Sequence, residues 1–417
     1  MTLDLSHYTK TEKTIGVADV IFDQEQYPRD EGFDQATVDQ YGTALNLPRI
    51  VINENMKLVD GYHRLIARRV GQQETIDAEV WNVPDDDIMW VSVILNARHG
   101  LQLSMRSKKS KARQFYSNGH KRSIDDIATV LAASKGAVSN WTSDLRQKER
   151  DAEKERVWDL WLGCKTQQEI ADICGISQQL VAKNIKITTE FINEKRGNPP
   201  DSLQLYTVWK FQTNDDRYGI KYPGRIPGQI IENVLYYYTD LFAKVVDPFG
   251  GGGTTVDVCK EMNRRYLAYD INPVRDDIIE NDITSGFPKA AKGADLVFLD
   301  PPYWAQKQGD YSAHETNLAN LPLDGFYDAM AEIFKGAKHI LSPGGVIALI
   351  IGPTQNDGVV YDHAYDLSKR MEKHFSFANR IIVPYTTQQV KGYHVADAKK
   401  GKYLLKLHRD LLIYRRN

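Results

Sequence analysis

A glycine-rich loop between two short apolar strands is the feature that most constrains how this chain can fold. Residues 245–247 (Val-Val-Asp) form an apolar run that ends in an acid, and Pro-Phe-Gly-Gly-Gly-Gly-Thr-Thr follows. A helical pattern comes next, and residues 266–270 (Tyr-Leu-Ala-Tyr-Asp) form a second run that ends in an acid. This order predicts the first strand–helix–strand unit of an open α/β sheet. The loop lacks the Gly-Lys-Ser/Thr ending of a phosphate-binding P-loop.

A third apolar run delivers a tetrapeptide with two prolines and an aromatic residue. Residues 295–299 predict a buried strand, which is followed by Asp300, Pro301, Pro302 and Tyr303. Open α/β sheets bind ligands beyond the carboxyl ends of their strands, where this tetrapeptide is expected. The prolines restrict the chain, so the Asp300 carboxylate and the Pro301 carbonyl can accept both hydrogens of an exocyclic amine. Tyr303 offers an aromatic face on which a base can stack.

Together the two motifs resemble motifs I and IV of the amino-methylating DNA methyltransferases, over about residues 205–417. The resemblance implies a Rossmann-like domain that uses S-adenosyl-L-methionine to methylate the N6 amine of adenine in double-stranded DNA. N4-cytosine methylation is the nearest alternative, although a serine would be more usual there than Asp300. RNA methylation stays open, as does a ParB-like partition or transcription protein with a vestigial methyltransferase domain.

The same resemblance implies which residues bind the cofactor. Asp270 is expected to hold the ribose, and Asp282, after a further strand, to approach the adenine. The run Tyr-Pro-Gly-Arg-Ile-Pro-Gly-Gln at 222–229 is similar to motif X, which closes over the methionine end. Gly252 stands where the family usually has serine. The expected cofactor-binding residues are Pro227, Asp247, Phe249, Gly250, Gly252, Thr254, Asp270 and Asp282.

Residues 1–105 predict a separate small α/β domain. Its short β-rich runs and one helical pattern lie at residues 49–52, 57–59, 77–81 and 62–70. The stretch Asp-Gly-Tyr-His-Arg resembles the ParB N-terminal, sulfiredoxin-like fold, in which a strand turns at Asp-Gly into a helix. That resemblance implies a phosphate or nucleotide site at Asp60, His63 and Arg64, although ParB proteins have Gly-Glu-Arg-Arg where this chain has Gly-Tyr-His-Arg. Nucleotide binding, a scaffold role and contact with DNA phosphates are the alternatives.

Residues 123–187 contain an internal repeat with a constant offset of 43 positions. The repeated positions are Ile127, Ala128, Ser134 and Val138 in one copy and Ile170, Ala171, Ser177 and Val181 in the other. Each copy predicts a helix-turn-helix, with turns at Ala132 and Gly175 and helix N-caps at Ser123 and Thr166. The second helix of such a unit normally enters the major groove, whereas the alternative is a helix pair that only packs. The candidates to contact DNA are Lys135, Ser139, Asn140, Gln178, Gln179, Lys183 and Asn184.

Charge and composition complete the expected organisation. The formal net charge is -2, but the run from Arg98 to Arg122 carries eight basic residues and no acid, so it can face phosphate or form a solvated helix face. Three cysteines give neither a disulfide framework nor a zinc site, and no metal is expected.

We expect three domains, at 1–105, 106–195 and 196–417. Without a membrane span or signal peptide, a cytoplasmic or nucleoid-associated protein is expected, and a homodimer stays open.

The source of target recognition is a further expectation. No large insertion separates the glycine loop from the Asp-Pro-Pro-Tyr tetrapeptide. Recognition is therefore expected from the N-terminal half, from residues 384–408, or from both. The second of these segments carries Lys391, Lys399, Lys400 and Lys402 before a final strand.

Overall fold

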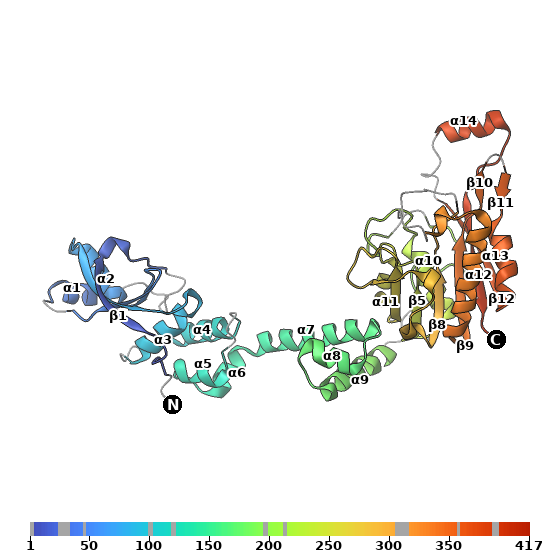
Figure 1. The fold of residues 1–417 in the computed structure, drawn as a ribbon. Helices are drawn as coiled ribbons and strands as arrows, with labels where there is room; N and C mark the ends of the chain where they lie inside the picture. The colour runs from blue at the N-terminus through green and yellow to red at the C-terminus, as the bar shows by residue number, and fades with distance from the viewer. Residues whose placement is uncertain are drawn as a thin grey trace. The chain divides into compact units, whose positions relative to one another are not determined.

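The chain forms two compact units, residues 1–152 and 153–417 (Figure 1). The computed structural model describes residues 4–23, 34–44, 47–98, 103–117, 122–194, 199–211, 215–304, 317–356, 359–385 and 392–417. The division falls inside a long helix, α7 (Ser143–Leu162), which joins the two predicted helix-turn-helix units. The second helix-turn-helix therefore belongs to the same compact unit as the C-terminal sheet. The three-domain division stays a prediction.

The first unit begins with the predicted α/β domain. Its sheet has the order β1-β4-β2-β3, with β4 and β2 parallel and the outer pairs antiparallel. The bounds are β1 Lys10–Gly16, β2 Ile50–Asn53, β3 Leu58–Asp60, β4 Thr75–Trp81, α1 Gln35–Gly42 and α2 Tyr62–Val70. Gly61 precedes α2 with φ +102, and a β-carbon there would lie 2.7 Å from the Ile50 side chain. The predicted strands and the tight glycine turn are confirmed.

Helices complete this unit and include the first helix-turn-helix. They are α3 Ile88–Arg98, α4 Met105–Ser117, α5 Ile124–Val130 and α6 Lys135–Trp141. Ser123 and Ser134 cap α5 and α6, each accepting a backbone hydrogen bond at 3.1 Å. Ala132 turns between the helices with φ +45. The predicted motif is therefore present in its first copy.

The second copy has the same construction in the second unit. It consists of α8 (Gln167–Cys174) and α9 (Gln178–Glu194). Thr166 and Glu169 form a complete capping box, and Gly175 turns with φ +66. Ile170, Ala171 and Val181, like their counterparts in the first copy, are buried.

The basic run of residues 98–122 is only partly a free surface. Lys111 is 5% exposed. Arg113 donates to Asp144 at 2.8 Å, and Arg122 pairs with Asp87 and lies over the Trp90 ring. These cations contact groups of their own unit, so fewer cations of the run are available to a phosphate than its composition indicates.

A seven-stranded sheet organises the second unit, in the order β12-β13-β9-β8-β5-β6-β7. Strand β13 runs antiparallel to the other six strands, which are parallel to one another. The strands are β5 Lys244–Asp247, β6 Arg265–Asp270, β7 Ile279–Glu280, β8 Ala294–Leu299, β9 Leu341–Ile351, β12 Ser376–Pro384 and β13 His408–Arg415. A short hairpin, β10 (Thr354–Asn356) and β11 (Val359–Tyr361), stands apart. The predicted Rossmann-like sheet is confirmed.

Helices cover both faces of this sheet. One core cluster packs α10 (Gly228–Tyr238) and α11 (Thr254–Glu261) on one face, and another packs α12 (Leu323–Ile340) and α13 (His363–Met371) on the other. Along the chain, helix α14 (Gly392–Gly401) follows β12 and precedes β13. No helix in the described part of the chain is long and apolar enough to cross a membrane.

The C-terminal part of α7 packs against the amino ends of the parallel strands. Trp158 and Trp161 contact Phe242, which lies just before β5, with ring centroids 5.9 and 5.6 Å apart. Arg265, the first residue of β6, lies over the Trp161 ring at 5.2 Å. The second helix-turn-helix is thus attached at the edge of the sheet opposite to the carboxyl ends of these strands.

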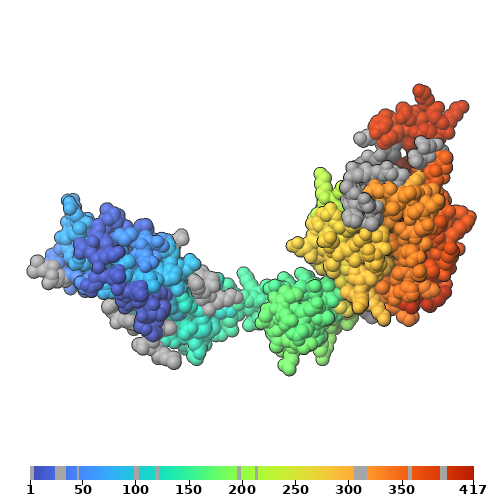
Figure 2. Space-filling view, viewed as in Figure 1, coloured from blue at the N-terminus to red at the C-terminus, as the bar shows by residue number. Residues whose placement is uncertain are grey.

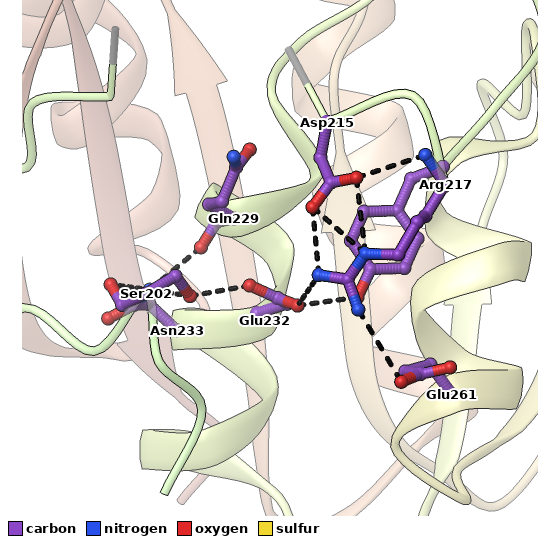
Figure 3. A network of polar contacts seen from close by, with 8 residues as sticks. Ser202, Asp215, Arg217, Gln229, Glu232, Asn233 and Glu261 are labelled. Carbon is purple, nitrogen blue, oxygen red and sulfur yellow. Dashed lines mark hydrogen bonds and ion pairs between the residues drawn. The ribbon is translucent and has the colours of Figure 1, made fainter. Parts of the chain in front are cut away.

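A buried carboxylate joins the segment before the sheet to α10 (Figure 3). Glu232 accepts hydrogen bonds of 2.5 Å from the hydroxyl groups of Tyr218 and Ser202. Arg217 lies 3.7 Å from the same carboxylate and 3.6 Å from that of the exposed Glu261. Since Glu232 is buried and its partners depend on it, its removal leaves polar groups without acceptors.

We expect Glu232→Ala to lower the free energy of unfolding by about 3 kcal/mol, because it breaks a buried network. Glu261→Ala removes an exposed partner of the same arginine and should change it by about 0.5 kcal/mol or less. Urea unfolding of both variants measures the difference. Equal effects from the two substitutions would contradict the role given to Glu232.

Candidate active site

Three carboxylates gather at one edge of the sheet because β5, β6 and β8 run parallel. Asp247 and Asp270 end β5 and β6, and Asp300 follows the last residue of β8. This edge is where open α/β sheets bind their ligands. The structure therefore brings the predicted glycine loop and the predicted catalytic tetrapeptide together.

Asp247 holds the glycine loop through hydrogen bonds at both of its ends. It accepts hydrogen bonds from the Phe249 backbone N–H at 2.8 Å and from the Thr255 hydroxyl at 2.5 Å. Burial raises its pKa to about 6, although these hydrogen bonds oppose the shift. Its oxygens thus hold the loop together, which is a supporting role within the predicted cofactor site.

Asp270 and Asp282 lie at the tips of successive strands, as predicted. Asp270 accepts hydrogen bonds from the backbone N–H groups of Gly251 at 2.8 Å and Asn272 at 2.9 Å. A carboxylate oxygen accepts more than one hydrogen bond, so Asp270 can still receive ribose hydroxyl groups. Asp282 follows β7 and accepts hydrogen bonds from the backbone and hydroxyl of Thr284.

The segment before α10 lies against the glycine loop and explains the unusual glycine in it. Ile220 donates a backbone hydrogen bond of 2.9 Å to the Gly252 carbonyl. A β-carbon on Gly252 would lie 2.8 Å from the Tyr222 β-carbon and 2.9 Å from the Ile220 carbonyl oxygen. Glycine is therefore required at position 252, because Ile220 and Tyr222 occupy the space that a side chain would need.

The remaining predicted cofactor residues surround this loop. The Gly250 backbone N–H donates to the Tyr269 carbonyl at 2.7 Å, and the Phe249 side chain packs against a core cluster. Thr254 is buried, and its hydroxyl would lie 2.5 Å from a β-carbon on Gly219. Pro227 is buried at the start of α10. Their contact with a cofactor stays a prediction.

Asp300 lies in an environment that opposes its charge. Burial is the main cause that raises its pKa to about 7; Asp247 raises it further and Arg409 lowers it. Within the described residues, no group donates a hydrogen bond to its carboxylate. Among the described residues this distinguishes Asp300 from Asp247 and Asp270, whose carboxylates accept backbone hydrogen bonds.

A buried cluster beside Asp300 was not predicted from the sequence. Arg409, on β13, is only 7% exposed and lies 4.7 Å from the centroid of the Tyr385 ring, and its Nε atom has no hydrogen-bond partner among the described residues. A β-carbon on Gly352 would lie 2.9 Å from the Tyr385 hydroxyl and 3.2 Å from the Tyr303 ring. Two adjacent charged residues, Arg409 and Asp410, at the start of a strand that is otherwise apolar and buried are the signal that could have revealed Arg409.

The predicted DNA-contacting residues divide into exposed and engaged side chains. Asn140, Gln178, Gln179 and Lys183 are exposed. Lys135 is exposed and pairs with Asp125 at 2.6 Å. The Ser139 hydroxyl accepts a hydrogen bond from Arg146 at 2.6 Å.

Asn184 corrects the prediction. It is 6% exposed, and its amide nitrogen has no hydrogen-bond partner among the described residues. The repeat offset of 43 aligns it with Trp141, which packs against the core of the first copy. Asn184 therefore occupies a core position and faces away from any DNA bound at the surface of α9.

The proposed phosphate site in the first unit is occupied by internal contacts. Arg64 forms an ion pair of 2.7 Å with Asp60 and donates to the carbonyls of Pro48 and Arg49. The His63 Nε2 atom accepts a hydrogen bond from the Asp34 backbone at 3.0 Å. A phosphate would have to compete with these contacts, and its binding here stays a prediction.

Comparison with known families agrees with this geometry. A family model described as DNA methylase matches residues 79–281 and 294–417, which is most of the chain. The chain belongs to the DNA methylase family. This family comprises N6 and N4 methyltransferases that depend on S-adenosyl-L-methionine, so the predicted cofactor is confirmed at the level of the family.

Individual proteins similar to the chain match smaller parts of it. The transcriptional regulator NovG of Streptomyces niveus is 37% identical over 92 residues, which are 21% of this chain, and the chain spans only 29% of that protein. A Thermus thermophilus protein described as a DNA modification methylase, solved with S-adenosyl-L-methionine, is 21% identical with a TM-score of 0.22. The match covers 32% of this chain and 51% of that protein. The partitioning protein ParB of Caulobacter crescentus, solved with CTP-γ-S, is 15% identical (TM-score 0.20, 42% and 99%).

Gly252→Ala should weaken S-adenosylmethionine binding about 10-fold or more, because the new methyl group must displace the segment that carries Tyr222. Gly136→Ala in α6, where the nearest heavy atom to an added β-carbon is 4.0 Å away, is the matched control. Isothermal titration of both variants with the cofactor provides the test. Unchanged affinity in Gly252→Ala would show that this segment does not shape the pocket.

Proposed function

We propose that this methylase transfers a methyl group from S-adenosylmethionine to the N6 amine of adenine in double-stranded DNA. The observation that carries the proposal is the Asp300 carboxylate, which follows β8 at the same edge as the glycine loop. No described group donates a hydrogen bond to it. An exocyclic amine has two hydrogens to donate, and Pro301 offers a second acceptor through its carbonyl.

The charges at this edge suit the cofactor. S-adenosylmethionine, when bound, supplies a methyl group attached to a positively charged sulfur. Burial raises the pKa values of both Asp247 and Asp300, and Asp270 and Asp247 respectively raise them further, so a nearby cation stabilises the ionised forms. Asp270 would hold the ribose, and the loop from Phe249 to Gly252 would lie against the cofactor through its backbone.

The residues of the tetrapeptide then act on the substrate amine. The Asp300 carboxylate and the Pro301 carbonyl accept its two hydrogens, which localises electron density on nitrogen as it approaches the methyl carbon. The methylated nitrogen carries one proton in excess, and Asp300, with its raised pKa, is placed to accept it. In a duplex the base must leave the stack at a cost of a few kcal/mol, which stacking on Tyr303 would offset.

Cytosine is the second candidate substrate, because its N4 amine presents the same two hydrogens. Both bases therefore satisfy Asp300 and Pro301 equally. The preference for adenine rests on the aspartate, since the resemblance to N4-cytosine enzymes would favour a serine at this position.

The substrate is tested by incubating the protein with methyl-labelled S-adenosylmethionine and separate DNA and RNA, followed by nucleoside mass spectrometry. We expect label in N6-methyladenine of DNA, and its loss in Asp300→Asn with cofactor binding nearly unchanged. Asp366→Asn, on α13, is the matched control and should retain activity. Label in N4-methylcytosine, or only in RNA, would contradict the proposal.

The pH dependence of the reaction tests the charge of Asp300. Its carboxylate is the active form, so kcat/KM at subsaturating substrates should fall about tenfold per pH unit below about pH 7. Arg409→Gln removes the cation that lowers this pKa and should move the acid limb upward by about 1 to 3 pH units, whereas Arg409→Lys should restore it. Among the described residues, the other titratable groups that act on Asp300 are Asp247, Tyr303 and Tyr385, and both tyrosines are neutral at pH 7.

Arg380→Gln is the control for this measurement. Arg380 pairs with Asp410 at 2.8 Å on the neighbouring strand, and it is not among the charges that shift the pKa of Asp300, so its loss removes an arginine without removing a charge that acts on Asp300. An acid limb that stays in place in Arg409→Gln, or moves equally in Arg380→Gln, would exclude the electrostatic role of Arg409.

A further inference from the structure

The segment that joins β12 to β13 begins and ends at the edge of the sheet where Asp300 follows β8, which we call the catalytic edge. Since β13 is antiparallel to both β12 and β9, β12 is parallel to the central strands and ends at the same edge as β8. Pro384, its last residue, pairs with His408, and the Tyr385 backbone N–H donates to the Leu407 carbonyl at 2.7 Å. Tyr385 and Arg409 belong to the cluster around Tyr303. The segment thus begins and ends beside Asp300.

The described part of this segment, residues 392–407, has the charge expected of a phosphate-binding surface. Lys399, Lys400 and Lys402 are exposed near the end of α14, and Asp397 is the one acid among these residues. No ion pair to another described residue involves these three lysines. Figure 2 shows α14, in red, projecting from the surface of the second unit. The lysine charges are therefore not neutralised by described parts of the protein.

Exposed apolar side chains accompany these lysines. Leu404 is 81% exposed, and the neighbouring Tyr403 is 42% exposed. An added β-carbon on Gly401 would lie 2.8 Å from the Tyr403 ring, so the ring packs against the turn that follows α14. Proteins that distort DNA combine basic residues with apolar side chains that enter the base stack, and an enzyme that extrudes a base needs such a distortion.

We propose that residues 392–407 form a docking surface that holds duplex DNA over the active site. Lys399, Lys400 and Lys402 contact phosphates, and Leu404 contacts the base stack beside the extruded nucleotide. This inference rests on the proposed action on DNA and identifies the surface that brings the duplex to Asp300.

The position of the second helix-turn-helix supports this choice. It is attached through Trp158 and Trp161 at the amino ends of β5 and β6, whereas Asp300 lies at the carboxyl end of β8. Six residues of β8 span about 20 Å. DNA held on α8 and α9 alone would therefore lie at the opposite edge from the catalytic carboxylate, and a separate contact is needed at the active site.

The test compares DNA binding by the full chain and by a variant with Lys399, Lys400 and Lys402 changed to Gln. An unmethylated duplex of mixed sequence is titrated at about 50 to 200 mM salt. Each lysine that contacts a phosphate contributes about 0.9 to the slope of log K against log salt, so the slope should fall by about 0.9 per lysine. Leu404→Ala should lower the methylation rate of duplex DNA more than that of single-stranded DNA, because only the duplex requires base extrusion.

The matched control changes Lys289, Lys292 and Lys335 to Gln, which removes the same charge from positions away from the catalytic edge. Cofactor binding should be unchanged in both triple variants. A salt slope equal to that of the wild type in the first variant, or an equal fall in the control, would overturn the inference. If the triple variant fails to fold, the three single Lys→Gln variants carry the same test. Absence of any DNA binding or methylation by the wild type would instead refute the proposed function.

Discussion

The buried carboxylate of Asp247 is the constraint on which the candidate site depends. It binds the backbone at Phe249 and the hydroxyl of Thr255, and so fixes both ends of the glycine loop to the end of β5. Asp270 then accepts a hydrogen bond from the middle of that loop. Because the strands are parallel, the loop and the tetrapeptide that begins at Asp300 are held at the same edge of the sheet.

This arrangement accumulates negative charge where a cationic cofactor is required. Asp247 raises the pKa of Asp300, and Asp270 raises that of Asp247. Arg409 opposes this effect from the one strand that runs against the others. The edge is thus balanced between an ionised and a protonated Asp300, as expected if Asp300 takes the proposed role of accepting the hydrogens of an amine and then a proton.

Local sequence patterns predicted the parts that depend on neighbouring residues. The strands that end at Asp247 and Asp270, the caps at Ser123 and Thr166 and the turns at Ala132 and Gly175 follow from such patterns and were confirmed. Asn184 was misassigned because polarity was given more weight than its register with Trp141, which places it in the core.

Contacts between residues far apart in the sequence could not be predicted from such local patterns. Arg409 meets Tyr303 across more than a hundred residues, and the need for glycine at position 252 depends on the position of Tyr222. The internal ion pairs of Arg64 and Arg113 likewise show that basic residues counted as free in the sequence are bound within the fold.

A crystal structure with S-adenosylhomocysteine bound tests the central claim most directly. The account predicts that the ribose hydroxyl groups contact Asp270 and that the sulfur faces the Asp300 carboxylate across an open space large enough for an amine. A ligand bound elsewhere, or an Asp300 side chain turned away and hydrogen-bonded within the protein, would contradict it.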